Sequence, residues 1–291
     1  MFKTLLKIAA STVAQKAASA SNGQPSGKHP DEMSFLEHLE ALRWHIIRAL
    51  SAIVIVAIGV FAAKNFVFDT IILGPVDRNF PTYKWFCQLG ESLCFYPQGL
   101  EIITRDISEQ FMVHIRVSVW LGLIVAFPYV IWEFWKFIKP GLFDKERKAA
   151  RGLVTICSLL FLTGVLFGYF IISPFAITFL SAYSVSDKVA NTTTLSTLVN
   201  SMTMFTIPTG FVFELPIVIY FLAKIGLVSS EFLRSYRRHA LVVILIVAAI
   251  ITPPDVISQL LVSFPLYGLY EVGIVIAKRI EKKQKLEEQN G

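Results

Sequence analysis

The residue in this sequence best placed to do chemistry is a carboxylate inside an apolar run. Glu214 lies within about residues 198–223, a stretch long enough to cross a bilayer, and it is flanked by Pro208 and Pro216. A charge at bilayer depth costs about 2.5–3.5 kcal/mol on insertion scales, so such residues usually face other helices or a wet cavity. Glu214 is therefore predicted to be a functional polar site in the membrane. The simpler interpretation is a neutral carboxyl bonded to a neighbouring helix.

A second group of carboxylates lies near the ends of the apolar runs, among basic residues. Glu37 and Glu40 are three residues apart on one side of a predicted surface helix, and Glu146 lies in residues 136–151 with six Lys or Arg. Such carboxylates can hold arginines of a peptide through charge-assisted, often bidentate hydrogen bonds. In the simpler interpretation these acids are only solvated. Glu133 and Glu271 flank aromatic residues at span ends and are expected to be solvated or paired.

Motifs of hydrolases, nucleotide-binding proteins and zinc proteins are absent from the sequence. It contains no HExxH, GxSxG or GxxxxGK[ST] pattern, and its three cysteines have no metal-site spacing. An intramembrane aspartyl protease needs two aspartates within its spans, and in this sequence only Asp255 comes near that requirement. With Gln259, it follows two prolines in a predicted external turn, part of a cap to which Pro75 is also assigned. We therefore predict no enzyme activity, no metal and no cofactor.

Composition places these residues in an all-α membrane protein. Of 291 residues, 54% are hydrophobic and 16% are charged, and the mean hydropathy is +0.60. The net charge of +6 is better explained by basic cytoplasmic loops than by nucleic-acid binding.

Apolar runs predict six transmembrane helices in a membrane domain of residues 34–278. Residues 1–33 form a flexible basic tail before it, and residues 279–291 form a charged tail after it. A surface helix begins at Ser34 with a capping box and leads into the first span. The fifth span is shorter than the roughly 20 residues that cross ordinary hydrocarbon, so it should stop inside the far leaflet or thin the bilayer. The six spans are residues 46–63, 111–135, 152–180, 198–223, 240–252 and 256–277.

The distribution of basic residues predicts the orientation. Residues 1–48, 136–151, 224–238 and 278–291 together hold 21 of the 27 Lys and Arg residues. By the positive-inside rule these segments, and with them both termini, are cytoplasmic. Prolines near the far ends of several spans indicate bent helices and a curved bundle with a concave face. On the external side, Cys87 and Cys94 can close a small disulfide loop or stay free thiols.

Four short motifs resemble the TatC family, a subunit of the twin-arginine protein translocase. The resemblance covers about residues 34–278, and it is specific because the four motifs occur in order on matching topological features. It departs from the family at Ala41, where a glutamate is usual. The motifs are residues 38–43 (HLEALR), 137–142 (FIKPGL, followed by Glu146 and Arg147), 213–216 (FELP) and 252–259 (TPPDVISQ).

This resemblance implies a receptor for the twin-arginine signal peptides of folded proteins. The apolar part of the peptide would lie on the concave face, with Glu214 as its polar group. Since one residue turns a helix by about 100°, Glu40 is no direct substitute for the glutamate missing at position 41, and Glu146 is expected to carry more of the arginine binding. The binding residues that the resemblance implies are Glu40, Arg43, Phe137, Glu146 and Arg147.

The resemblance also implies partners and a location. The partners are single-span TatA- and TatB-type subunits, with TatB-like helices near the fifth span, further copies in a larger receptor complex, and membrane lipid. Transport would be driven by the protonmotive force in the bacterial cytoplasmic (inner) membrane, which is favoured over an organellar one. From the residues alone, the alternative is a proton-coupled small-solute transporter using Glu214, although that class normally shows further ionisable residues within its spans.

Overall fold

The computed structural model describes residues 35–90, 94–97, 100–138, 149–184, 186, 192–252 and 256–290. The chain divides into two units, residues 1–45 and residues 46–291, and the boundary falls inside a continuous helix. The predicted tail of residues 1–33 and the side chains of the predicted capping box lie outside the described residues.

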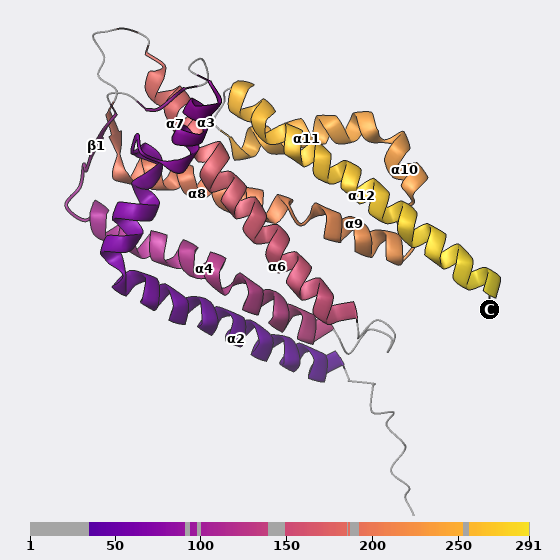
Figure 1. The fold of residues 1–291 in the computed structure, drawn as a ribbon. Helices are drawn as coiled ribbons and strands as arrows, with labels where there is room; N and C mark the ends of the chain where they lie inside the picture. The colour runs from indigo at the N-terminus through magenta and orange to yellow at the C-terminus, as the bar shows by residue number, and fades with distance from the viewer. Residues whose placement is uncertain are drawn as a thin grey trace, which may run out of the picture. The chain divides into compact units, whose positions relative to one another are not determined.

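Helices make up most of the described chain, and one short parallel pair of strands joins two of the loops (Figure 1). Two of the segments, η1 and η5, are π-helical, and η2 is a 3₁₀ turn. In chain order the elements are α2 (Phe35–Ala62), η1 (Phe66–Ile72), η2 (Gly74–Val76), α3 (Pro81–Leu89), β1 (Glu101–Ile103), α4 (Glu109–Ile138), α6 (Ala149–Phe167), η5 (Gly168–Ile172), α7 (Ser173–Ala182), β2 (Thr192–Thr194), α8 (Leu195–Val212), α9 (Leu215–Lys224), α10 (Ser230–Ser235), α11 (Arg237–Ile251) and α12 (Val256–Asn290).

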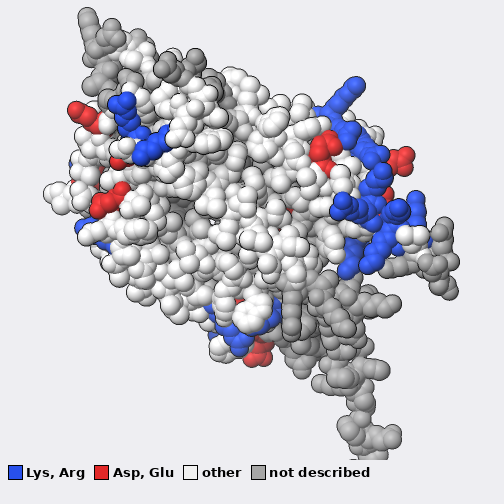
Figure 2. Space-filling view, viewed as in Figure 1, with Lys and Arg blue, Asp and Glu red and all other residues white. Residues whose placement is uncertain are grey.

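Among the described residues, five helical segments are long and apolar enough to cross a membrane. On the face in Figure 2, a broad band of uncharged side chains separates Lys, Arg, Asp and Glu residues that gather toward the edges. The predicted fifth span corresponds to α11, whose 15 residues make a helix of about 22 Å, shorter than the roughly 30 Å of bilayer hydrocarbon. The five segments are residues 39–62, 109–138, 152–182, 195–224 and 258–286.

Helix α8 lies at the centre of the second unit, where it packs against α4, α6 and η5. Glycines allow this packing to be close, as is common between membrane helices. A Cβ atom placed on Gly168 would lie 2.7 Å from the carbonyl oxygen of Phe205, and one on Gly164 would lie 2.8 Å from that of Thr209. The backbones of α6–η5 and α8 therefore nearly touch.

The fourth span is broken between α8 and α9 at Phe213 and Glu214. Pro216 has no backbone N–H, so it cannot bond the carbonyl four residues earlier, and its ring crowds that carbonyl. The chain bridges the break with tighter bonds, including one from the Glu214 N–H to the Phe211 carbonyl at 3.1 Å. A proline in the sequence thus fixes where the only glutamate of this span is placed.

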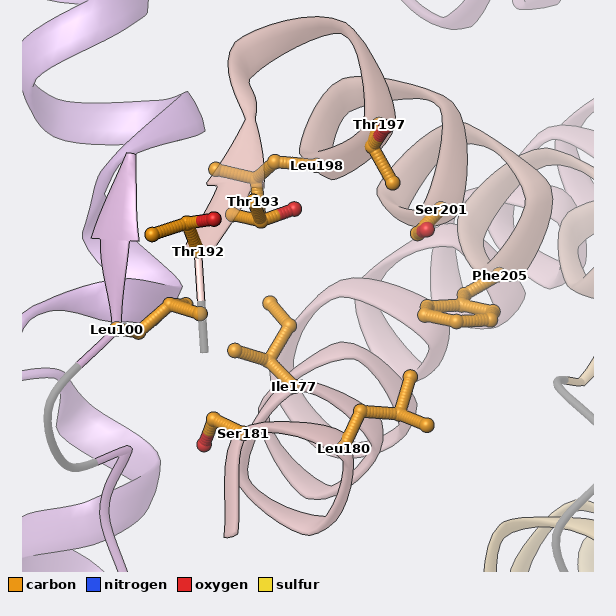
Figure 3. Close-up of a pocket in the computed structure, with 10 residues that line it drawn as sticks. All are labelled: Leu100, Ile177, Leu180, Ser181, Thr192, Thr193, Thr197, Leu198, Ser201 and Phe205. Carbon is orange, nitrogen blue, oxygen red and sulfur yellow. The ribbon is translucent and has the colours of Figure 1, made fainter. Parts of the chain in front are cut away.

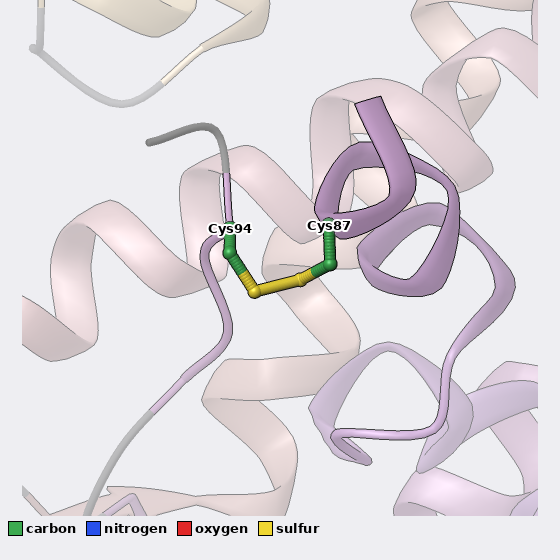
Figure 4. The surroundings of a disulfide bond; sticks show 2 residues. All are labelled: Cys87 and Cys94. Carbon is green, nitrogen blue, oxygen red and sulfur yellow. A yellow bond between two sulfur atoms is a disulfide. The ribbon is translucent and has the colours of Figure 1, made fainter. Parts of the chain in front are cut away.

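The segment predicted as the first external loop is folded rather than extended, and side-chain hydrogen bonds hold it to η5. The hydroxyl of Tyr83 donates to the Pro75 carbonyl at 2.6 Å, Thr82 donates to the Phe170 carbonyl at 2.5 Å, and Tyr169 donates to the Ile71 carbonyl at 2.8 Å. Cys87 and Cys94 are joined by a disulfide (Figure 4). Strand β1 of this segment pairs in parallel with β2, which lies in the segment predicted as the second external loop.

The residues predicted as a charged tail after position 278 continue α12 as helix up to Asn290. Hydrogen bonds fasten this extension to the connection between α9 and α10. The backbone N–H and hydroxyl of Ser230 donate to the Glu281 carboxylate at 2.5 and 2.6 Å, and Gln284 donates to the Lys224 carbonyl at 3.1 Å. The tail is therefore part of the packed unit.

Candidate functional site

The Glu214 carboxyl is partly buried between the broken fourth span and α6. The preceding residue, Phe213, is buried and packs against Phe167, which holds the break in place. The Cys157 thiol and the backbone at Phe161, both in α6, lie within interaction range of the carboxyl. Its Oε1 atom is buried and has no hydrogen-bond partner among the residues that the structure describes.

This arrangement suits binding better than catalysis. A buried acceptor that lacks a donor carries a free-energy cost that an incoming N–H or O–H group would remove. No group of three or more His, Cys, Asp or Glu that could hold a metal exists in the described part of the chain. The neighbouring Cys157 thiol is buried, so it is not accessible to a substrate as a nucleophile would have to be. Glu214 can therefore act as a docking point for a polar group.

Glu214 is not at the middle of its membrane segment. It lies ten residues from the end of the segment at Lys224 and 19 residues from its start at Leu195. At 1.5 Å per residue these distances are about 15 and 28 Å along the helix. The carboxyl therefore belongs to the half of the bilayer on the Lys224 side, which the sequence predicts to be cytoplasmic.

Of the predicted peptide-binding residues, the structure describes three. Glu40 and Arg43 are exposed on α2 in the first unit, and Phe137 is partly buried near the end of α4 in the second. Glu146 and Arg147 lie outside the described residues. The two described units are not placed relative to each other, so the predicted surface is seen only in parts.

A carboxylate that the sequence analysis did not assign to the site lies one helical turn from Phe137. Glu133 is 1% exposed, and its carboxylate lies 2.8 Å from the Lys136 ammonium and 4.0 Å from the Arg48 guanidinium. Glu271 pairs with Arg237 at 2.7 Å. Of the two outcomes that the sequence left open, solvated or paired, the structure shows both glutamates paired. The burial of Glu133 is new, and only its spacing of three from Lys136 hinted at it.

The predicted external cap is described at two of its three residues. Pro75 is fully buried, and its carbonyl accepts the Tyr83 hydroxyl; burial raises the pKa of Tyr83 to about 12, so this donor keeps its proton. The side-chain amide of Gln259 donates to the Leu245 carbonyl at 3.1 Å, which links α12 to α11. Asp255 lies outside the described residues.

A pocket of about 200 Å³, separate from the surroundings of Glu214, opens beside the β1–β2 pair (Figure 3). Hydroxyl groups of Thr193, Thr197 and Ser201 lie along one wall, while Leu180 and Phe205 lie toward the other. It contains none of the predicted site residues.

Comparison with known proteins identifies the family. The family model of the Sec-independent protein translocase protein (TatC) matches residues 37–265. The Sec-independent protein translocase protein TatC of Blattabacterium sp. subsp. Periplaneta americana is 41% identical over 261 residues, covering 87% of this chain and 98% of the relative. That of Carboxydothermus hydrogenoformans is 38% identical over 255 residues, covering 87% and 96%.

The fold agrees with this match. A crystal structure described as the twin-arginine translocase receptor TatC superposes with a TM-score of 0.66 at 31% identity, covering 84% of this chain and 99% of that one. The prediction of an all-α, multi-pass membrane protein is thereby confirmed, and the names of the relatives indicate a role in transport rather than catalysis. This chain belongs to the TatC family of Sec-independent protein translocase components.

Proposed function

We propose that this chain is the subunit that binds signal peptides in a twin-arginine translocase of the bacterial cytoplasmic membrane. The observation that carries the proposal is the 31% identity, over most of both chains, with a solved protein described as the twin-arginine translocase receptor. Each arginine of the Arg-Arg pair in a signal peptide carries a planar guanidinium group with five N–H donors, and carboxylates accept hydrogen bonds from this group in matching geometry.

The recognition surface in this proposal combines the start of α2 with the segment after α4. The exposure of Glu40 and Arg43 supports it, since a side chain that waits for a ligand must be reachable. Phe137 adds apolar area, and Glu146 takes the place of the carboxylate that Ala41 removes. Arg147 belongs to the same proposed surface.

Glu214 is the second element of the proposal. The apolar part of the peptide, or a partner helix, would offer its polar group to the Oε1 atom that has no partner among the described residues. The position of Glu214 toward the Lys224 end of its segment supports this role, because an inserting peptide enters from the cytoplasm.

The topology in this proposal has six spans, α11 included, with both termini in the cytoplasm. The short α11 presents an exposed apolar side that suits single-span TatA- and TatB-type helices, and further copies of the chain complete a larger complex. Residues on that side include Leu241, Val242, Ile246 and Ile250, which are 45% to 65% exposed.

The test is binding of a signal peptide bearing Arg-Arg, or Lys-Lys as its control, to the purified full chain in detergent. A carboxylate site should prefer Arg-Arg by about tenfold or more, since Lys cannot make the bidentate contact. Glu146→Ala should abolish the preference, whereas Glu231→Ala, an exposed acid on α10, should keep it. Equal binding of both peptides by the unaltered chain would overturn the proposal.

A transport assay in vesicles distinguishes the role of Glu214 from that of the proposed recognition surface. Glu214→Leu should keep the Arg-Arg preference of the solubilised chain but lower export of a folded precursor, whereas Glu214→Gln, which keeps polar atoms, should retain more export. If Glu214→Leu exported normally, the intramembrane carboxyl would have no part in transport.

A further inference from the structure

The groove between α4 and α8 changes character along its length. At its outer end, a pocket of about 270 Å³ is lined by charged and hydroxyl side chains, Arg105, Glu109, Arg116 and Ser196 among them. One to two turns deeper, a pocket of about 310 Å³ is lined almost wholly by apolar side chains, including that of Trp120. This second volume lies in the range of small-ligand sites.

The two pockets follow one another along the same pair of helix faces. On α4 the outer pocket uses residues up to Arg116, and the deeper one begins at Val117. On α8 the outer pocket uses Ser196, and the deeper one begins at Val199. Residues three or four apart share a helix face, and α4 packs against α8. A hydrogen bond from the Arg116 guanidinium to the Asn200 side chain crosses the groove at the junction.

The depth of each pocket matches the layers of a bilayer. Helix α4 has 30 residues and is about 45 Å long, which equals the thickness of hydrocarbon plus headgroups. The outer pocket spans its first two turns, at headgroup level, and Arg116 can extend its side chain back toward that level. The deeper pocket begins about 12 Å along the helix, within hydrocarbon.

The outer pocket offers partners for both signs of charge. Arg105 and Arg116 supply guanidinium groups, neither of which is in an ion pair with a carboxylate among the described residues. Asp106 and Glu109 supply carboxylates. The Glu109 oxygens accept the backbone N–H groups of Arg105 and Ser196 at 2.7 and 2.8 Å, and the Asp106 backbone and the Thr194 side chain also bond to this carboxylate. Its acceptor sites are therefore taken up by the protein, and the exposed carboxylate of Asp106 is left for an ammonium.

The deeper pocket lies where two π-helical turns meet the groove. Ile71 and Ile72 of η1 and Tyr169 and Phe170 of η5 line it beside α4 and α8. π-Helical turns are rare and often occur at functional sites, since they displace side chains from regular α-helical packing. Here they contribute to an apolar recess that opens beneath a polar one.

We propose that this groove binds one phospholipid of the outer leaflet whose headgroup carries both a phosphate and a primary ammonium. The phosphate accepts hydrogen bonds from Arg105 and Arg116, the ammonium donates to Asp106 beside the charge of Glu109, and one acyl chain fills the pocket beside Trp120. The order of charged and apolar partners with depth favours a lipid over a partner helix, which would have to place both charge signs at one level. The proposal does not depend on the proposed signal-peptide site.

Fluorescence quenching by phospholipids with brominated acyl chains tests this proposal, because Trp120 lines the deeper pocket. The probes are phosphatidylethanolamine, phosphatidylcholine and phosphatidylglycerol with identical chains, added to the detergent-solubilised full chain. Phosphatidylcholine lacks the N–H donors of the ammonium, and phosphatidylglycerol lacks the ammonium itself. The four other tryptophans, replaced by phenylalanine so that Trp120 alone reports, are Trp44, Trp85, Trp132 and Trp135.

Phosphatidylethanolamine should quench Trp120 at an at least tenfold lower lipid ratio than the other two, since each lost charged hydrogen bond weakens binding by about that factor. Arg116→Gln should abolish the preference. Arg78→Gln, which removes a guanidinium that lies over the Tyr96 ring instead, should keep it. Native mass spectrometry of the unaltered chain with the same lipids gives an independent reading if the tryptophan variant folds poorly.

Equal quenching by all three lipids, with equal retention in the mass spectra, would overturn the proposal. So would a preference that survives Arg116→Gln. In either case the occupant of the groove would be nonspecific lipid or a partner helix.

Discussion

Removing the ammonium of Lys136 is expected to destabilise the chain more than removing the charge of Glu133, with which it pairs. The asymmetry follows from burial: the Glu133 side chain is 1% exposed, whereas those of Lys136 and Arg48 are 37% and 55% exposed. Water can solvate either cation when the carboxylate is absent. It cannot reach the carboxylate when Lys136 is absent.

The variants Lys136→Met and Glu133→Gln isolate this effect. Met keeps the apolar stem of Lys136 but loses its ammonium, which lies 2.8 Å from the carboxylate and 3.4 Å from the centre of the Trp132 ring. A buried acceptor that loses its partner costs about 1–3 kcal/mol, and a buried charge costs more. Loss of the cation–π contact adds about 0.5–1 kcal/mol. Gln at position 133 leaves two solvated cations, and its cost should be about 0–1 kcal/mol.

The assay is the thermal unfolding midpoint of the detergent-solubilised chain, which for a domain of this size shifts by about 2–4 °C per kcal/mol. Lys136→Met should lower it by several degrees and Glu133→Gln by at most a few. Adding Glu133→Gln to Lys136→Met should restore part of the loss, because it removes a buried charge that has lost the closer of its two cations. A double variant less stable than Lys136→Met alone would refute the reasoning.

Three further predictions concern packing, protonation and the disulfide. Gly168→Ala should lower the unfolding midpoint, because its Cβ would lie 2.7 Å from the Phe205 carbonyl oxygen. The control Gly268→Ala places a Cβ with no atom within 4 Å and should keep or slightly raise the midpoint. Equal midpoints for the two variants would contradict the close packing. Burial raises the pKa of Tyr83 from 10.0 to about 12, so its contribution to stability is complete below pH 10 and is lost as the pH rises toward 12, by about 3 kcal/mol. Tyr83→Phe should lack this loss, and parallel pH curves for the two proteins would count against it. Replacing Cys87 and Cys94 together by serine should lower the free energy of unfolding by about 2–3 kcal/mol, and a reductant should lower the midpoint of the unaltered chain to the same value. A midpoint that neither change lowers would contradict this prediction.

The sequence was sufficient to locate the apolar runs of the five long helices, but it placed Glu214 near the middle of its run rather than toward the Lys224 end. Span positions follow from the length of apolar runs, because the hydrocarbon thickness fixes how many residues a crossing helix needs. The break beside Glu214 was not predicted, although its cause, the missing N–H of Pro216, acts locally, whatever packs around it. The short α11, by contrast, was predicted from the prolines that follow residue 252.

Features made by contacts between distant segments were not predictable. The charge pattern after residue 278 reads as a solvated tail, and only the hydrogen bonds from Ser230 to Glu281, 51 residues apart, show why it is packed. The parallel pairing of β1 with β2 and the burial of Glu133 also depend on the assembled fold. The predicted receptor residues came from a family resemblance, since a surface acid such as Glu40 looks the same whether it binds arginine or water.

The depth of Glu214 gives a physical reason for its tolerance in an apolar span. Its segment is about 45 Å long, so with roughly 30 Å of hydrocarbon about 7 Å of helix lies in each headgroup layer. Glu214, about 15 Å from the Lys224 end, is then only about 8 Å inside the hydrocarbon. A charge there costs less than at the bilayer centre, because water defects and local thinning reach it more easily. The short α11, which also favours thinning, lowers this cost further. In the proposed function, a carboxyl at this depth would meet a signal peptide that has entered only part of the bilayer, before any full crossing is required.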